Sequence, residues 1–286
     1  MLFAQIILNG ILLGGLYGLM ALGMALVWGV LNIVNLMHGS LIMLGGYIVY
    51  FLFVGAGIDP FAGLPIAMVV MFAFGYALQR YLLNLIVRSA LLNTLLITFG
   101  LDVVLTYLAQ LAFSADFRAI NPSYAGANIG VLGLTVPLAR LAAFLAAFFL
   151  ALLLWLLLER TRMGRAIRAT AQNLTAARLY GVDPRKLYAI TFGIGAALAG
   201  AAGGLYGMVS QLTPYMGASL TAKSFVIAII GGLDDPLRVV AAGLVIGIAE
   251  ALAALYLSPT LTDAISFGLL VLILIARPAR SLRMAS

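Results

Sequence analysis

One stretch of this sequence restricts the possible folds more than any other: LAAFLAAFFLALLLWLLL, at positions 141–158. It contains no charged residue and no strongly polar residue over its whole length. A helix needs roughly 20 mostly apolar residues to cross the hydrocarbon core of a bilayer. Because the backbone of such a segment must satisfy its polar groups without water, the stretch predicts a membrane-spanning α-helix.

Similar apolar segments recur along the chain, at 4–30, 38–55, 61–79, 91–113, 136–158, 187–209, 219–232, 238–257 and 262–276. We therefore expect an all-α, polytopic transmembrane bundle with about eight or nine membrane segments, forming a single domain over residues 1–286. The second and seventh segments are short and glycine-rich, which favours tilted, broken or re-entrant helices. Such backbone is tolerated only where it is buried in protein or lines a wet cavity.

Composition excludes several classes of protein. Only 9% of the residues are charged, against about 25% in a soluble domain, and the unbroken apolar runs differ from the short alternating segments of a membrane β-barrel. With no cysteine and one histidine, we expect no thiolate or histidine-rich metal site. No GxxxxGK[ST] phosphate loop occurs, so we expect no catalytic residue and no cofactor in this chain. The 31 glycines predict close helix packing within the subunit.

The sixteen Lys and Arg residues predict an orientation, because basic residues favour the cytoplasmic side. With nine crossings, four connections carry most of them on one side: Arg80 and Arg88, the seven residues between 160 and 186, Arg238, and Arg277, Arg280 and Arg283. We therefore expect the C-terminus and the 159–186 loop in the cytoplasm, and the N-terminus outside as the start of a first spanning helix rather than a signal peptide. Arg118, Arg140 and Lys223 are left for the outer side, where the longest loop, 114–136, is rich in residues that favour turns.

Two acidic residues, Asp102 and Glu250, lie inside apolar segments. An intramembrane carboxylate is costly and usually faces a bundle interior or a pathway. Each therefore predicts either a polar lining of a translocation path or a hydrogen-bonded structural acid. For Glu250, near the middle of its segment, we favour a lock between helices. A proton relay would need several titratable groups in sequence, and this chain has few.

A polar cluster lies where the first apolar segment gives way to the second, in LNIVNLMHGSLIMLGG. It comprises Asn32, Asn35, His38 and Gly39, and Asn and Gly permit unusual backbone conformations. Two interpretations stay open. The cluster is either a discontinuous helix near a translocation path, or a cytoplasmic connection between helices that side-chain hydrogen bonds hold. A lone histidine without partners is not typical of a catalytic or metal site.

The polar stretch GRAIRATAQNLTAARLYGVD, at 164–183, interrupts the apolar pattern in the middle of the chain. Helix-forming residues over 162–172 predict one short helix, and 174–180 predict a second. The residues that delimit them are Asn173 or Thr175 as the cap of the second helix, Gly181 after it, and Asp183-Pro184 before the next membrane segment. Two separately capped helices are more structure than contact with anionic lipid requires. We therefore favour a docking element for a cytoplasmic partner over a membrane-surface segment.

This stretch resembles the cytoplasmic coupling loop of inner-membrane permeases of ABC importers, specifically the branched-chain amino-acid (Liv-type) permeases. Three other stretches carry the resemblance: NGILLGGLYGLMALGMALVWGVLNIVNLMHGSLIMLGGY, IIGGLDDPLRVVAAGLVIGIAEAL and YLSPTLTDAISFGLLVLILIARPARSL. The likeness covers nearly the whole chain in order. It implies a bacterial inner-membrane permease that pairs with a second, related permease. Two cytoplasmic ATPases, which carry ATP and Mg, would dock on the loop, and a periplasmic binding protein would deliver the substrate; no nucleic acid is involved.

Carried over by position, the resemblance implies two sets of residues. The coupling set is Gly164, Arg165, Arg168, Ala169, Asn173, Ala176, Ala177, Leu179 and Gly181. The pathway set is Asn35, His38, Gly39, Thr98, Phe99 and Gly100, to which we add the intramembrane acids Asp102 and Glu250.

The chain departs from the family pattern at two places. Leu174-Thr175 stand where Pro-Glu is common, which removes a carboxylate from the loop, and GGLDDP with Asp234 and Asp235 replaces a common GGLGS. Permeases of this type also serve urea, short amides and other carboxylated compounds, so the substrate stays open. Two other classes also stay open: an ATP-independent secondary transporter or channel, and a homodimeric sugar-type ABC permease.

Overall fold

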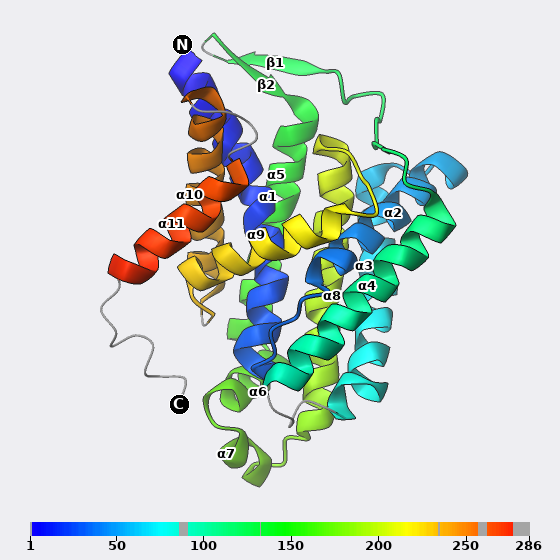
Figure 1. Cartoon of the computed structure of the whole chain (residues 1–286), viewed down its shortest axis with the longest axis vertical. Helices are drawn as coiled ribbons and strands as arrows, with labels where there is room; N and C mark the ends of the chain where they lie inside the picture. The colour runs from blue at the N-terminus through cyan, green and yellow to red at the C-terminus, as the bar shows by residue number, and fades with distance from the viewer. Residues whose placement is uncertain (1, 86–90, 132, 234, 257–261, 277–286) are drawn as a thin grey trace.

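The computed structural model describes residues 2–85, 91–131, 133–233, 235–256 and 262–276 (Figure 1). Within these residues the chain forms eleven α-helices, one 3₁₀ turn and one two-stranded antiparallel sheet. The elements follow one another as α1 (Leu2–Leu31), α2 (His38–Ala56), α3 (Pro60–Tyr81), η1 (Leu83–Leu85), α4 (Leu91–Phe113), β1 (Asn128–Val131), β2 (Leu134–Pro137), α5 (Leu138–Arg160), α6 (Arg162–Gln172), α7 (Leu174–Leu179), α8 (Pro184–Val209), α9 (Met216–Gly231), α10 (Pro236–Tyr256) and α11 (Thr262–Ala276).

Nine helices of the described residues match the nine apolar segments of the sequence. Seven are long and apolar enough to cross a membrane, namely α1, α2, α3 with η1, α4, α5, α8 and α10. Two shorter apolar helices are α9 and the Ala264–Ile273 part of α11. The predicted all-α, polytopic bundle is therefore confirmed. In Figure 1, α1, α5, α8 and α10 run along the long axis, whereas the 16-residue α9 crosses the bundle obliquely.

Glycines let the long helices approach one another backbone to backbone. A Cβ built on Gly14 of α1 would lie 2.7 Å from the Gly243 carbonyl oxygen of α10, and a Cβ on Gly45 of α2 would lie 2.1 Å from the Gly200 Cα of α8. No side chain fits at such distances, so small residues set both interfaces. The predicted packing of glycine-rich faces within the subunit is confirmed at these two interfaces.

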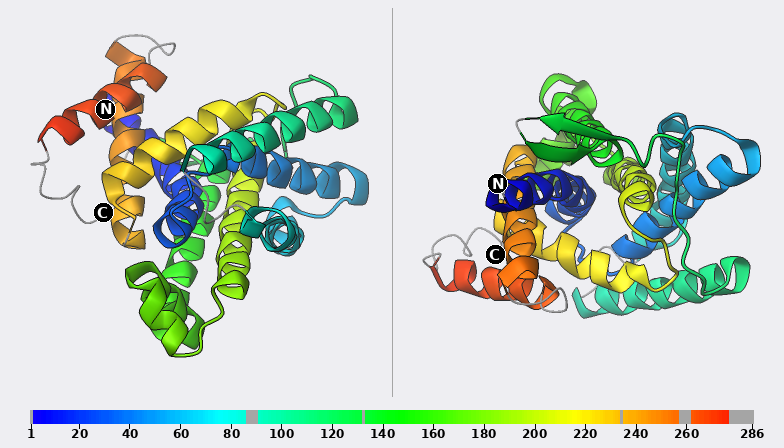
Figure 2. Two further views of the ribbon diagram at one scale, coloured as in Figure 1. Left: turned by 60° about the horizontal axis from the view of Figure 1, so that its bottom comes forward. Right: turned by 90° about the horizontal axis from the view of Figure 1, so that it is seen from above.

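The two ends of the bundle hold different elements (Figures 1 and 2). At one end lie α6 and α7 with the ends of α1 and α3, and Asn84 Nδ2 donates to the Arg185 carbonyl oxygen at 3.1 Å. At the other end lie the start of α1 and the β1–β2 hairpin, where Gln5 Nε2 donates to the Thr135 carbonyl oxygen at 2.7 Å. Arg80, in the last turn of α3, therefore lies at the same end as the basic residues at 160–186, as the charge pattern predicts.

The position of Lys223 differs from the outer side that the charge pattern predicts for it. Arg140 lies in the first turn of α5, at the hairpin end, as expected for the side opposite the basic loop. Lys223, however, lies inside α9, and its side chain is only 12% exposed because it pairs with Glu250. A lysine whose charge is balanced by a buried carboxylate is no guide to topology, since it is part of the bundle interior.

The connection between α4 and α5 contains a hairpin where the sequence predicts only turns. Val131 of β1 pairs with Leu134 of β2, and Gly133 between them has a φ of +80°. Tight two-residue hairpins require such positive φ angles, which glycine adopts without steric cost. The preceding chain is fastened to the bundle, since Arg118 and Leu212 exchange backbone hydrogen bonds at 3.0 and 2.6 Å.

Candidate functional site

The polar loop between α5 and α8 folds into two short helices, each capped by a side chain. Thr161 Oγ1 accepts from the Gly164 N–H at 3.0 Å at the start of α6. Asn173 Oδ1 accepts from the Ala176 N–H at 2.9 Å at the start of α7. The predicted pair of capped helices is confirmed, with Asn173 rather than Thr175 as the second cap. The Thr161 cap was not predicted, although a threonine directly before a helix is an ordinary start signal.

The signals that end the loop also act as predicted. Gly181 follows α7 with a φ of +83°, in the left-handed region that favours glycine. Asp183 Oδ1 then accepts from the Arg185 N–H at 2.9 Å, and Pro184 opens α8. The loop therefore has a defined backbone from the end of α5 to the start of α8.

This loop is held against the membrane helices. A Cβ built on Gly164 would lie 2.3 Å from the carbonyl oxygens of both Leu157 and Leu158, so α6 touches the last turn of α5 directly. Ile167 and Ala177 are buried, with 1% and 3% of their surfaces exposed. The packing of α6 on α5 and of these side chains into the core makes the α6–α7 element, residues 162–181, a rigid extension of the bundle.

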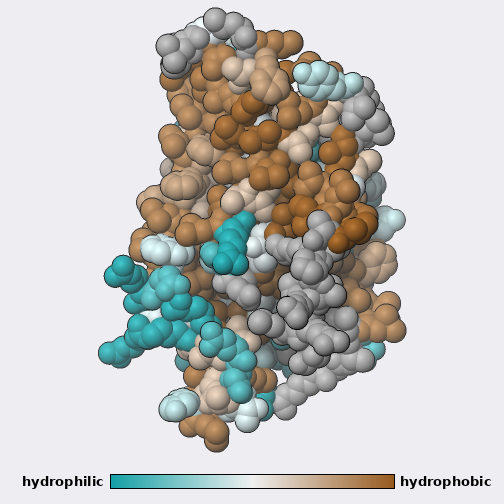
Figure 3. Space-filling model, turned by 90° about the vertical axis from the view of Figure 1, so that its left-hand side faces the viewer, coloured by the Kyte–Doolittle hydropathy of each residue, from teal (hydrophilic) through white to brown (hydrophobic). Residues whose placement is uncertain are grey.

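Two large side chains stand out from the tip of this element. Leu179 and Tyr180, at the end of α7, are 85% and 90% exposed. In Figure 1, α7 lies at the extremity of the molecule, and Figure 3 shows hydrophilic residues gathered at this end of the face that it draws, below a hydrophobic upper part. Nearby, Arg168 pairs with Glu159 at the end of α5. This polar end of the molecule therefore presents a leucine and a tyrosine side by side to its surroundings.

The residues predicted to form the coupling element divide by their surroundings. Gly164 and Ala177 are buried and pack the element against the bundle, and Arg168 and Ala176 are half-buried. The others are exposed and available to a partner: Arg165, Ala169, Asn173, Leu179 and Gly181.

Both departures from the family pattern have a structural role here. Leu174, the first residue of α7, packs against the core, while Thr175 beside it is exposed. Asp235 Oδ1 accepts from the Leu237 N–H at 2.9 Å and so caps α10. Asp234 lies outside the described residues, as do Arg88 and the three C-terminal arginines.

The chain between α1 and α2 turns back into the bundle. Asn32 ends α1 in the left-handed conformation, with a φ of +54°. Residues 33–35 are not helical, and Ile33 and Asn35 are 1% and 0% exposed. Non-helical backbone between the two helices fits either interpretation of this cluster, and residues 33–35 lie within the protein interior rather than in a surface loop.

Two threonines from other helices satisfy the backbone of this interrupted segment, residues 32–39. Thr98 Oγ1 of α4 accepts from the Leu36 N–H at 3.3 Å and donates to the Val34 carbonyl oxygen at 3.2 Å. Thr221 Oγ1 of α9 accepts from the Gly39 N–H at 2.7 Å and donates to the Leu36 carbonyl oxygen at 3.1 Å. The hydroxyls replace the missing helical hydrogen bonds, which an apolar surrounding requires.

The first residues of α2 add further polar contacts. His38 Nε2 lies 2.9 Å from the Met20 carbonyl oxygen, and since a carbonyl only accepts, this nitrogen carries the proton. Ser40 Oγ donates to Asp102 Oδ1 of α4 at 2.5 Å. The fully buried Asn35 side chain has no hydrogen-bond partner for either amide atom among the described residues. Buried polar groups without partners are uncommon and usually contact water or a ligand.

The structure thus brings together most of the predicted pathway residues, namely Asn35, His38, Gly39, Thr98 and Asp102. It separates Phe99 and Gly100 from them. Phe99 is 54% exposed, and no described residue lies within 4 Å of a Cβ built on Gly100, so both lie on an open face of α4 within the described structure. Thr221 was not predicted, because a threonine in an apolar helix is ordinary and its partner lies far away in sequence.

Glu250 lies in a second polar cluster, which joins four helices. Its carboxylate oxygens lie 3.0 and 3.1 Å from Lys223 Nζ of α9, and Ser266 Oγ of α11 donates to it at 2.6 Å. Lys223 Nζ also donates to Tyr17 Oη of α1 at 3.1 Å. Glu250 itself is 4% exposed. The geometry is that of a lock between helices, in agreement with the favoured interpretation of this acid.

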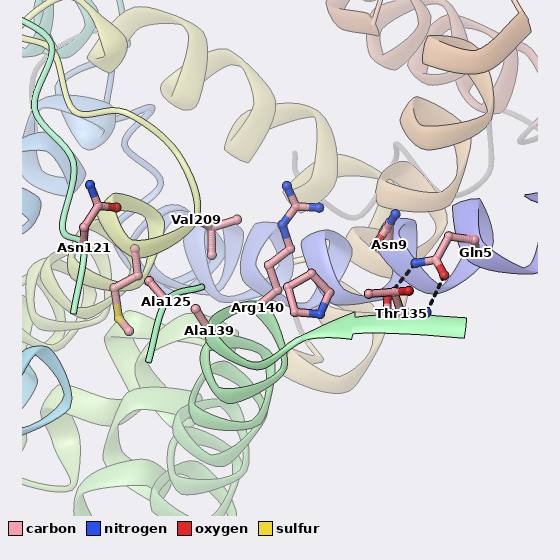
Figure 4. A pocket seen from close by; sticks show the side chains of 10 residues that line it. Gln5, Asn9, Asn121, Ala125, Thr135, Ala139, Arg140 and Val209 are labelled. Atoms are coloured by element: carbon pink, nitrogen blue, oxygen red, sulfur yellow. Dashed lines mark hydrogen bonds between the residues drawn. The ribbon is translucent and has the colours of Figure 1, made fainter. Parts of the chain in front are cut away.

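A cavity of about 600 Å³ with both polar and apolar walls opens at the hairpin end (Figure 4). Its wall carries the side chains of Gln5 and Asn9 from α1, Asn121 from the connection to the hairpin, and Arg140 from α5. In Figure 4 the Arg140 guanidinium lies between Asn9 and Asn121. Among the described residues, no three His, Asp or Glu side chains lie close enough together to hold a metal ion.

Comparison with known proteins gives a consistent result. The family model described as "Branched-chain amino acid transport system / permease component" matches residues 6–274. The permease protein LivH of the high-affinity branched-chain amino acid transport system of Escherichia coli K12 is 32% identical, over 96% of this chain and 94% of LivH. The corresponding BraD of Pseudomonas aeruginosa is 30% identical over the same shares.

A second type of permease also matches. LivM of the same transport system in Escherichia coli K12 is 27% identical, over 92% of this chain and 67% of LivM. No solved structure matches this chain.

Proposed function

This chain belongs to the family of branched-chain amino acid transport system permease components, and we propose that it is one permease subunit of an ABC importer in a bacterial inner membrane. The solute is a small amino-acid-like compound, either a branched-chain amino acid or a related carboxylated or amide compound. Two cytoplasmic ATPases carry ATP and Mg and supply the energy, and a periplasmic binding protein supplies the solute. The chain itself does no covalent chemistry.

The exposed tip of α7 is the observation that carries this proposal. Leu179 and Tyr180 are 85% and 90% exposed at the end of an element that is capped and packed on the bundle. A membrane-surface helix would turn its apolar side chains toward the lipid, whereas these two stand at the extremity of the molecule (Figure 1). Docking of an ATPase would bury them. With the basic end of the bundle in the cytoplasm, the α6–α7 element faces the compartment that contains ATP.

Movement of the element can reach the bundle through two helices. α6 packs directly on the last turn of α5 at Gly164, and α7 leads into α8 through Asp183 and Pro184. α8 in turn packs along α2 and α3. Nucleotide-driven closure of the ATPases would therefore tilt α5 and α8 and bias the bundle between two arrangements.

The interrupted segment at 32–39 is our candidate for the translocation path. It is non-helical backbone inside a membrane bundle, and the amide of Asn35 and the Nδ1 atom of His38 have no partner among the described residues. In transporters such segments occur where a solute or water passes. Matches to both LivH and LivM, which are two permease proteins of one transport system, support a pair of non-identical permeases over a homodimer.

The proposal predicts that Gly181→Val weakens coupling without preventing membrane insertion. Valine is strained at a φ of +83°, where a residue with a Cβ costs roughly 1–2 kcal/mol. Nothing lies within 4 Å of the new Cβ, so the strain acts on the α7 cap alone. We expect a several-fold fall in ATP-driven solute uptake and in ATPase stimulation, both measured in proteoliposomes that contain the complete transporter.

Gly181→Asn is the matched control, because asparagine tolerates the left-handed conformation. It should retain most of the uptake. If Gly181→Val transports the solute and stimulates the ATPases as the wild type does, the α6–α7 element is not the coupling device.

A further inference from the structure

The cavity at the hairpin end has the chemistry of a site for a small carboxylated solute. We propose that it is an entry subsite in which Arg140 binds the carboxylate of the solute before translocation. This inference rests on the proposed function, because it names the group of the solute that the outer end of the permease recognises. The cavity volume of about 600 Å³ lies within the roughly 300–1,000 Å³ of small-molecule sites.

Arg140 is exposed, and it adds a positive charge to a helix end that is already positive. It is the third residue of α5, and the first turn of a helix carries partial positive charge from its free N–H groups. Among the described residues, none that lines the cavity is acidic, and none forms an ion pair with Arg140. A bound carboxylate would balance both the guanidinium and the helix terminus, and a guanidinium binds a carboxylate through two parallel hydrogen bonds.

One of the two amides that α1 contributes to the cavity wall is available to bind a solute. Gln5 is occupied, because its side chain exchanges two hydrogen bonds with the Thr135 backbone at 2.7 and 2.8 Å. The buried Oδ1 atom of the Asn9 side chain has no hydrogen-bond partner among the described residues. Turning this amide toward the cavity therefore breaks no hydrogen bond of that atom. In Figure 4, Asn9 and Arg140 lie on the same side of the hairpin strand, so an amide and a guanidinium face one solute together.

The rest of the wall suits the apolar part of such a solute. Ala139, Met208 and Val209 line the same cavity, from the start of α5 and the end of α8. A compound with a carboxylate, an amino group and a short hydrocarbon side chain matches this combination. A simple anion would use the arginine alone.

The absence of cysteine in the sequence allows a direct test by thiol protection. Ala125, which is half-buried and lines the cavity, is changed to Cys in the complete transporter, and the rate of its reaction with an anionic methanethiosulfonate is measured. We expect leucine to slow the reaction several-fold and leucinamide, which lacks the carboxylate, to leave it unchanged. In the Ala125→Cys/Arg140→Gln variant, leucine should no longer protect, whereas Arg140→Lys should keep part of the protection.

Gly126→Cys is the matched control, since its Cβ meets nothing within 4 Å and the residue does not line the cavity; leucine should not protect it. Equal protection by leucine and leucinamide, or protection that survives Arg140→Gln, would overturn the proposal. The proposal would also be overturned if the binding protein without a solute blocked the reaction of the thiol, because the cavity would then be a docking surface for that protein. ATP-driven uptake is measured in parallel. Leucine uptake without protection removes only this subsite, whereas a wild type that takes up neither leucine nor a related carboxylated or amide compound removes the proposed function.

Discussion

Replacing Lys223 with methionine is expected to cost the folded protein about 3–5 kcal/mol, the range for a buried ion pair that loses one partner. Glu250 is 4% exposed. In this variant its carboxylate would keep the hydrogen bond from the Ser266 hydroxyl but lose the ammonium that balances its charge. Its carboxylate must then stay charged in the bundle interior or take up a proton, and both outcomes cost free energy. Glu250→Gln is expected to cost a similar amount, because it removes the carboxylate that balances the charge of the Lys223 ammonium. Stability would be measured as the denaturant dependence of unfolding in detergent.

The double variant Lys223→Met/Glu250→Gln makes this expectation specific. It removes both charges, so it should lose clearly less stability than the sum of the two single losses, with a coupling energy of about 0.5–3 kcal/mol. Glu159→Gln is the control, because the pair of Glu159 and Arg168 is 41% and 39% exposed and such pairs contribute about 0–1 kcal/mol. Additive losses in the double variant would show that Lys223 and Glu250 do not act as a pair.

Gly203→Ala is expected to have an effect of similar size, for a steric reason. A Cβ on Gly203 of α8 would lie 1.8 Å from the Ile42 carbonyl oxygen of α2 and 2.7 Å from the Gly46 nitrogen. These are backbone atoms, so the helices must move apart along their contact. Inserting a methyl group into a well-packed core costs about 1–3 kcal/mol when side chains can yield, and here none can. We expect at least that loss, seen as a lower melting temperature and a lower yield of folded protein.

Gly55→Ala provides the control within α2. Nothing lies within 4 Å of its Cβ, and replacing glycine by alanine within a helix is favourable by roughly 0.5–1 kcal/mol. It should therefore be neutral or stabilising. If Gly203→Ala is as stable as Gly55→Ala, the close contact between α2 and α8 is not the feature that holds these helices.

Most of the fold could be predicted because it depends on local sequence. Apolar runs set the nine segments, and the loop at 162–183 carries its own start and stop signals in Asn173, Gly181 and Asp183. Each of these residues acts on backbone groups within a few positions of itself, so the spacing of residues along the sequence is sufficient to predict the helix ends. The hairpin at 128–137 was missed because its signal, a glycine between short β-forming runs, is weak in a segment rich in turn residues.

The candidate site could be predicted only in part, since its partners are distant in sequence. The break at Asn35 and His38 is visible as a polar interruption, but Thr98 and Thr221 reach it only through the packing of α4 and α9. The charge count places Lys223 on the outer side because it does not show that Glu250 neutralises it. Long-range pairs of this kind depend on which helices become neighbours.

The central claim is that ATPases dock on the α6–α7 element, and a single cross-linking measurement tests it most directly. Tyr180→Cys, in this cysteine-free sequence, carries a photoreactive maleimide in the complete transporter, and Phe117→Cys serves as the control. Phe117 is 73% exposed and lies in the connection at the hairpin end. We predict that the probe at position 180 cross-links to an ATPase subunit and that the probe at position 117 does not. A transporter that imports its solute but shows no cross-link from position 180 to an ATPase would contradict the account.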